Sequence, residues 1–87
     1  MKISSGYLLK TVAGKSIVIP VGDNPDFGGM ITLNDTGTFL WNLLQKNTTK
    51  ENMLEDLLKE YDVTVDEAKD DIDAFIEKLS SLHILED

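Results

Sequence analysis

The sequence contains no cysteine and no arginine, and it has one histidine and one tryptophan among its 87 residues. Without cysteine, the chain forms no disulfide, no thiolate metal site and no thiol nucleophile. Because His83 is the single imidazole, two-histidine metal sites and most histidine-based acid–base arrangements are also excluded. No apolar run approaches the roughly 20 residues of a membrane-spanning helix, and the start of the chain lacks the pattern of a signal peptide. These absences predict a cytoplasmic protein that is not an enzyme.

The charge that is present is mostly negative. Sixteen Asp and Glu residues against eight lysines give a net charge of −8. Residues 1–34 hold three lysines and two aspartates, a sum of +1, whereas residues 35–87 hold five lysines and fourteen acids, a sum of −9. Affinity for nucleic acid comes largely from Lys and Arg side chains that displace counterions, so such a surface is a poor partner for phosphate backbones. The composition predicts one small folded domain over residues 1–87 that does not bind nucleic acid or membrane.

The first third of the chain is rich in β-branched residues and glycine, which favours short strands and turns. Two strands are predicted at Tyr7 to Val12 and Lys15 to Val21, joined at Ala13-Gly14, where glycine allows the positive φ of a tight hairpin. A period-two alternation in the second strand predicts one buried face. The residues of this alternation are Ile17, Ile19 and Val21. Pro20 has no N–H to donate, so we expect it at an edge or at a strand end.

A loop over residues 22–29 precedes Met30 to Leu33, which is the third predicted strand. A small sheet leaves at least one edge with unpaired N–H and C=O groups, and such an edge is either protected or pairs with an extended peptide. Met30 to Leu33 carries neither charge nor proline, the usual edge-blunting features, and Gly28 and Gly29 lack side chains that would obstruct an incoming chain. The same pattern also fits an internal strand that is paired on both sides.

Three helices are predicted in the remainder, and polar residues mark where each one begins. Asn34 can cap the first helix, and Thr48-Thr49-Lys50-Glu51 and Thr64-Val65-Asp66-Glu67 resemble capping boxes for the second and third. Gly37 disfavours the first helix by roughly 1 kcal/mol relative to alanine, so we expect a neighbour to pack closely against it. Stripes of helical period predict the buried faces. They comprise Phe39, Leu40, Leu43 and Leu44, with Trp41 at the margin; Met53, Leu54, Leu57, Leu58 and Tyr61; and Val65, Ala68, Ile72, Phe75, Ile76, Leu79 and Leu82.

Three strands followed by three helices predict an α+β fold, a winged helix-turn-helix with a small three-stranded antiparallel sheet. In a DNA-binding protein of this shape the third helix would enter the groove. Here that helix carries a row of carboxylates opposite its apolar stripe, which a phosphate backbone would repel. The row consists of Asp66, Asp70, Asp73 and Glu77. We interpret it as a solvated face, with a docking surface for a basic partner as the sharper alternative.

Catalytic and carrier chemistries find little support in the residues. His83, near the end of the third helix, is interpreted as a partly buried or capping histidine. Ser80-Ser81 and Thr48-Thr49 have no recognisable base beside them, which argues against a nucleophile. Carboxylates at helical spacing lack the loop geometry that wraps Ca²⁺. Acyl carrier proteins are also small, acidic and helical, but their Asp-Ser-Leu triplet does not occur here.

Three segments carry a family resemblance when they are taken together. LNDTGTFLWNLL joins a Leu-Asn strand end to a Trp-containing helix, and TKENMLEDLLKEYDV contains a Leu-x-x-x-Tyr-x-Val helix end. EAKDDIDAFIEKLSSLHIL contains an Asp-rich opening and an Ala-Phe-x-x-x-Leu helix. In order and spacing they resemble the PqqD-like family, the peptide-binding chaperones also called RiPP recognition elements, over essentially the whole chain. One departure is His83, which stands where the family often has glycine.

The resemblance implies a domain that does no chemistry and needs no cofactor. In the family, the leader of a ribosomally made precursor peptide adds as an antiparallel strand to the third strand, in the groove beside the third helix. The domain presents the leader to a modifying enzyme, often a radical S-adenosylmethionine protein. The implied strand contacts are Gly29, Met30, Ile31, Thr32 and Leu33. The implied helix contacts are Asp71, Phe75, Lys78 and Leu82, with Lys69 and Ser80 on the other margin as the alternative.

The sequence therefore favours a peptide-binding chaperone that serves a modifying enzyme. The runner-up hypothesis is a winged-helix transcriptional regulator or a general protein-interaction module without a peptide groove. An enzyme in its own right is the third and weakest hypothesis, because no residue constellation supports one.

Overall fold

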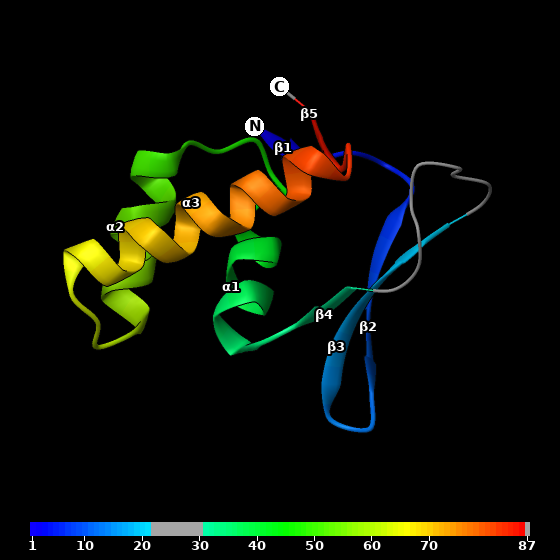
Figure 1. Cartoon of the computed structure of the whole chain (residues 1–87), viewed down its shortest axis with the longest axis horizontal. Helices are drawn as coiled ribbons and strands as arrows, with labels where there is room; N and C mark the ends of the chain where they lie inside the picture. The colour runs from blue at the N-terminus through cyan, green and yellow to red at the C-terminus, as the bar shows by residue number, and fades with distance from the viewer. Residues whose placement is uncertain (22–30, 87) are drawn as a thin grey trace.

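A computed structural model describes residues 1–21 and 31–86 of the chain. It contains a three-stranded antiparallel sheet followed by three helices, which confirms the predicted α+β fold. Figure 1 shows the β2–β3 hairpin extending beyond the helices. The elements are β1 (Lys2–Ile3), β2 (Tyr7–Val12), β3 (Lys15–Pro20), β4 (Ile31–Leu33), α1 (Asp35–Leu43), α2 (Lys50–Glu60), α3 (Val65–Ser81) and β5 (Leu85–Glu86).

Two very short strands, β1 and β5, were not predicted from the sequence. They pair with each other as a separate two-stranded sheet, with Ile3 opposite Leu85. The backbone N–H of Ile3 also donates to the carbonyl of Leu44, and that of Ser4 to the carbonyl of Ile84. Strands of two residues have no detectable periodicity, so only their partners from the other end of the chain define them.

The β2–β3 hairpin turns at Ala13-Gly14, as predicted. Both residues have positive φ, 53° for Ala13 and 77° for Gly14, which is the signature of a type I′ turn. At the other end of the hairpin, the N–H of Val21 donates to the carbonyl of Gly6 over 2.7 Å. Pro20 ends β3, which agrees with its lack of a donor.

The buried face of β3 is the opposite of the one predicted. Val18 is fully buried, whereas Ile17 and Ile19 are only half-buried and lie on the other face of the sheet, and Val21 is exposed and follows the strand end. Every residue from Ile17 to Val21 except Pro20 is β-branched and apolar, so the alternation has no polar members to fix its phase. The contact of Val18 with Ile31 across the strands, and with the core, decides which face is inside.

Side-chain caps begin all three helices. The N–H of Gly37 donates to Oδ1 of Asn34 over 2.7 Å, and the N–H of Glu67 to Oγ1 of Thr64 over 3.1 Å, as predicted. For α2 the prediction was wrong by one residue, because the capping hydroxyl belongs to Thr49, which accepts from the N–H of Asn52. Two consecutive threonines offer two equivalent caps, and the packing of Met53 and Leu57 sets the helical register.

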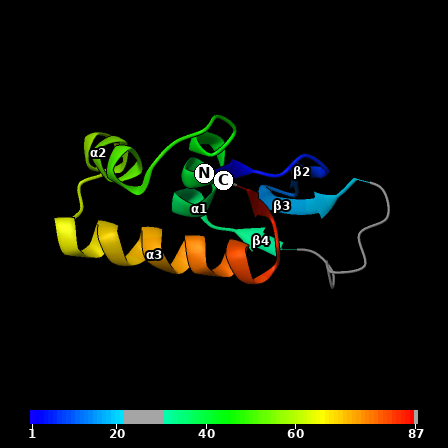
Figure 2. The same cartoon turned by 90° about the horizontal axis from the view of Figure 1, so that it is seen from above.

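Helix α1 lies at the centre of the core, against α2, α3 and β4. Figure 2 shows α1 between α2 and the sheet, with α3 running along one side. Trp41, expected at the margin of the apolar stripe, is 2% exposed and is the largest buried side chain. Val65, expected in the stripe of α3, is 47% exposed because it is the first residue of that helix.

Helix α3 ends in a Schellman motif centred on His83. The N–H of His83 donates to the carbonyl of Ser80, and the N–H of Ile84 to the carbonyl of Leu79. His83 has a φ of 58°, the left-handed conformation that favours glycine. Its side chain is exposed rather than partly buried. The residue that caps the helix is Leu82, and His83 is the residue that follows it.

We predict that His83→Gly raises the free energy of unfolding by about 0.5–1 kcal/mol, because glycine adopts the left-handed conformation without strain. Chemical denaturation followed by circular dichroism measures the change. Ser81→Gly, two residues earlier and still helical, is the matched control and should lower stability by a similar amount. A destabilised His83→Gly variant would contradict the reading of this turn.

Candidate peptide-binding site

Strand β4 is an edge of the sheet in the part of the chain that the structure describes. It pairs with β3 on one side, in the register Ser16 with Leu33, Ile17 with Thr32 and Val18 with Ile31. On its other side no described strand pairs with it, so the alternative of an internal strand is not seen in residues 1–21 and 31–86. Gly29 and Met30, two of the predicted contacts, lie outside the described residues.

The hydrogen-bond phase of the sheet shows which backbone groups face this edge. In an antiparallel pair, opposed residues alternate between bonded and non-bonded pairs. The bond from Val21 to Gly6 fixes the phase, so Lys10–Ile17 is a bonded pair of β2 and β3, whereas Val18 directs its N–H and C=O to β4. On β4, Ile31 and Leu33 therefore face β3, and the N–H and C=O of Thr32 face outward.

A groove of about 600 Å³ runs between β4, the start of α1 and the C-terminal half of α3. Figure 2 shows β4 as the strand of the sheet that lies nearest to α3. Four side chains of α3 at positions i, i+3, i+4 and i+7 form one wall, since these positions share one helix face. The groove is lined by Lys15, Thr32, Leu33, Asn34, Thr36, Gly37, Leu40, Asp71, Ala74, Phe75 and Lys78.

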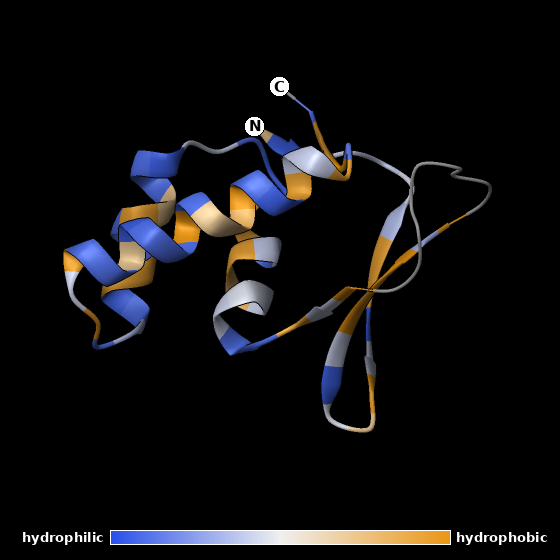
Figure 3. Cartoon of the chain, in the orientation of Figure 1, coloured by the Kyte–Doolittle hydropathy of each residue, from blue (hydrophilic) through white to orange (hydrophobic). Residues whose placement is uncertain are grey.

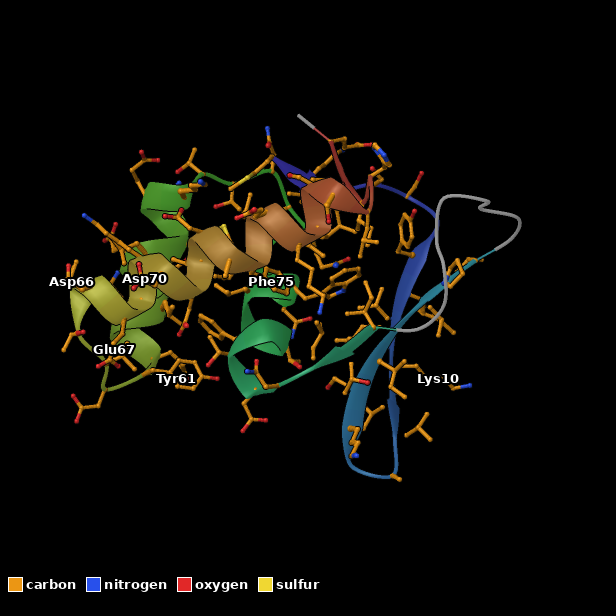
Figure 4. The ribbon with its side chains drawn as sticks, in the orientation of Figure 1. Lys10, Tyr61, Asp66, Glu67, Asp70 and Phe75 are labelled. Carbon is orange, nitrogen blue, oxygen red and sulfur yellow. The ribbon has the colours of Figure 1, made fainter. Side chains whose placement is uncertain are left out.

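Five of the residues predicted for a site line this groove: Thr32, Leu33, Asp71, Phe75 and Lys78. Figure 4 shows Phe75 on the part of α3 that crosses α1.

Two predicted residues do not line it. Ile31 is 8% exposed and belongs to the core, and Leu82 follows the end of α3 and packs against that core. The residues of the alternative helix margin do not line this groove either. Lys69 borders a smaller hollow between α2 and α3, and Ser80 borders a hollow near His83.

Six lining residues were not predicted: Lys15, Asn34, Thr36, Gly37, Leu40 and Ala74. Asn34 to Gly37 form the first turn of α1, which follows β4 directly in the chain. Their position next to the strand in the sequence could therefore have predicted that they line the groove. Ala74 lies on the same helix face as Asp71, Phe75 and Lys78, so the helical spacing could also have predicted it. Lys15, at the hairpin end, comes to the groove only through the pairing of β3 with β4.

Gly37 shows how closely the groove floor is packed. A Cβ at this position would lie 3.1 Å from Oδ1 of Asn34 and 3.4 Å from Cβ of Leu33. The expected close neighbour of Gly37 is therefore the helix cap together with the end of β4. A larger residue here would displace the cap that begins α1.

The groove combines an apolar floor with charged rims. Leu33 and Leu40 are buried beneath it, and Phe75 is half-buried in its wall. Lys15 and Lys78 supply cations, and Asp71 supplies a carboxylate. Such a surface suits an extended peptide with apolar and acidic side chains rather than a small polar substrate.

No group of three or more His, Cys, Asp or Glu side chains in the described part of the chain is placed to hold a metal ion. No helix in residues 1–21 and 31–86 has the length and apolar character needed to cross a bilayer. The carboxylates Asp66, Asp70, Asp73 and Glu77 are all exposed, and Asp73 forms an ion pair with Lys50 at 3.0 Å.

Comparison with known proteins assigns the family. The family model for coenzyme PQQ synthesis protein D (PqqD) matches residues 5–85. The chain belongs to the PqqD family. No curated protein matches this PqqD-family chain. Among solved structures, it is similar to TbiB1 in complex with the TbiA(beta) leader peptide, with a TM-score of 0.78 and 22% sequence identity, over 99% of this chain and 95% of that one. This likeness shows that the two proteins share a fold.

Because Ile31 is buried in the core, a charged substitution at this position should affect the stability of the fold. We predict that Ile31→Asp lowers the free energy of unfolding by at least about 3 kcal/mol, because it removes a buried side chain and places an unpaired carboxylate in the core. Thr32→Asp, at the exposed neighbouring position, is expected to cost less than about 1 kcal/mol. Urea denaturation of both variants measures the difference, and equal stabilities would contradict the placement of the two side chains.

Proposed function

We propose that this protein binds the leader of a ribosomally synthesised precursor peptide as an added antiparallel strand on β4 and presents it to a modifying enzyme. The observation that carries the proposal is the outward-facing backbone of Thr32 beside a groove whose far wall is α3. Membership of the PqqD family supports it. So does the shared fold with TbiB1, whose structure contains a leader peptide.

The register of β4 indicates how a leader would lie. Directly opposed residues in an antiparallel pair place their side chains on the same face. A leader residue opposite Thr32 would exchange both backbone hydrogen bonds with it and direct its side chain to the exposed face. The leader residues on either side, opposite Ile31 and Leu33, would direct theirs into the groove toward Phe75 and Ala74.

The groove side chains would supply selectivity. Burying apolar side chains against Leu40 and Phe75 contributes about 25 cal/mol per Å² of apolar area. Lys15 and Lys78 favour an acidic leader residue at the rim, and Asp71 disfavours one nearby. Ordering a flexible leader costs roughly 2–5 kcal/mol of the gross interaction energy, so moderate affinity is expected.

The role is proposed to be non-catalytic and without a cofactor. The chemistry on the precursor would belong to the partner enzyme, and a radical S-adenosylmethionine enzyme is the class that the family resemblance implies. The protein is proposed to act in the cytoplasm, where a ribosomally synthesised precursor is made. Gly29 and Met30 are also proposed strand contacts, and Leu33 is a proposed contact as a residue that lines the groove. The backbone N–H and C=O groups of Ile31 and Leu33 pair with β3, so they are not proposed to bond the leader. Leu82 follows the end of α3 and packs against the core, so the proposed groove wall consists of the α3 residues from Asp71 to Lys78.

We predict that Thr32→Pro weakens leader binding by about tenfold, since one backbone hydrogen bond is lost and no donor remains at the outward position. The probe is a fluorescently labelled leader peptide of the cognate precursor, titrated by fluorescence anisotropy. The β3–β4 ladder does not use the N–H of Thr32, so the fold should persist, which circular dichroism checks.

The matched control is Thr32→Val, which keeps the backbone N–H and removes only the hydroxyl. Its affinity for the leader should stay within about twofold of the wild type. Equal affinities for Thr32→Pro and wild type would exclude strand addition at this residue. Amide chemical shifts that move on β2 and not on β4 or α3 would place the leader elsewhere.

The alternative regulator hypothesis leads to a separate prediction. The exposed carboxylates of α3 should prevent binding to double-stranded DNA even at low salt, because the phosphate backbone is repelled. A titration of nonspecific duplex DNA at about 20 mM salt, with bovine serum albumin as an acidic control, tests this. Binding that weakens steeply with added salt would favour a regulator.

A further inference from the structure

One face of the sheet points away from the helices and is apolar. Alternation along β2 and β3 places Leu8, Lys10, Val12, Ile17 and Ile19 on this side, which we call the outer face. Leu8 lies directly opposite Ile19, and Lys10 opposite Ile17. Figure 4 shows the Lys10 side chain pointing away from the helices.

The apolar side chains of the outer face are not part of the protein's own core. Neither the core nor the partly buried residues packed against it include Leu8, Val12, Ile17 or Ile19. Leu8 is 50% exposed and Val12 is 48% exposed. Figure 3 shows apolar segments on both strands of the hairpin, which extends beyond the helices. Opposed side chains in adjacent strands touch, so these residues form a continuous patch rather than isolated surface positions.

The charge around this patch is opposite to that of the rest of the protein. Residues 1–21 contain three lysines and no Asp or Glu, although the whole chain carries sixteen acids and a net charge of −8. Lys10 lies within the outer face, and Lys15 stands at its hairpin end. The complementary surface therefore has an apolar centre and carboxylates around it.

We propose that the outer face docks the enzyme that modifies the bound leader, through a patch of apolar side chains flanked by Asp or Glu on that enzyme. The inference rests on the proposed function. It adds a second interaction surface, on the opposite side of the sheet from the core, which leaves the groove between β4 and α3 to the leader.

The position of the outer face explains why an enzyme would use it. A leader strand added to β4 extends the same sheet, so its outward side chains continue the row Lys10, Ile17 and Thr32. An enzyme on this face contacts both this protein and the bound leader. It therefore binds the loaded protein more tightly than the empty one and receives the leader in a fixed register.

Neighbouring residues on β2 provide a matched test. Val12→Glu and Thr11→Glu add the same charge at adjacent exposed positions, but Val12 lies on the outer face and Thr11 on the other. Each variant is loaded with the labelled precursor leader and titrated with the cognate modifying enzyme, by biolayer interferometry. Leu8→Glu provides a second outer-face variant in case Val12→Glu alters the turn.

We expect Val12→Glu and Leu8→Glu to weaken enzyme binding at least tenfold and to slow leader modification, while Thr11→Glu changes neither. Leader affinity should stay within twofold in Leu8→Glu and Thr11→Glu. Saturating leader is used for Val12→Glu, because Val12 lies opposite Lys15 of the groove. Equal loss in Val12→Glu and Thr11→Glu would overturn the docking surface. So would wild-type dimers that dissociate in Val12→Glu on sedimentation, because a second copy would then occupy the face. A wild-type protein that binds no leader overturns the proposed function instead.

Discussion

The rest of the architecture depends on how β4 is placed. It pairs with β3 along one edge and its buried side chains enter the core, and no strand in residues 1–21 and 31–86 pairs with its other edge. Its bonded residues, Ile31 and Leu33, donate and accept toward β3, and their side chains are 8% exposed in the core. Between them, Thr32 directs its backbone away from the sheet. Pairing with β3 and burial in the core therefore determine the position and direction of the strand.

Helix α1 makes this arrangement possible because it connects the strand to the core. Asn34 ends the extended segment and caps the helix, and Gly37 allows the cap and the end of β4 to approach closely. One turn further on, Leu40 and Trp41 are buried among all three helices. The floor of the groove and the centre of the core thus share one helix, so the shape of the groove and the stability of the fold are linked.

Charge separates the surfaces of the molecule. The exposed carboxylates of α3 face solvent, whereas the hairpin carries lysines and apolar side chains and no acid. In a protein with a net charge of −8, the hairpin is the region that an acidic partner surface can approach without repulsion. Lys15 reaches the groove from this same region, so the proposed leader site and the outer face meet at the hairpin end. The two proposed binding surfaces would then lie side by side on one small sheet.

Local patterns were sufficient for much of this architecture. Turn chemistry at Ala13-Gly14, the caps at Asn34 and Thr64 and the stripe of α3 each depend on residues close in sequence, so the amino-acid sequence alone determined the hairpin and the helices. Which margin of α3 lines the groove was left open by the sequence and is decided by the position of β4. Tertiary packing decided the rest. A run of apolar residues in β3 does not indicate which face of the strand is buried. Two consecutive threonines do not indicate which of them caps α2. Strands β1 and β5 form only because the two ends of the chain pair with each other. Whether Ile31 points to the groove or to the core was likewise settled by Val18 and α1, since side-chain direction in a strand is fixed by its partners.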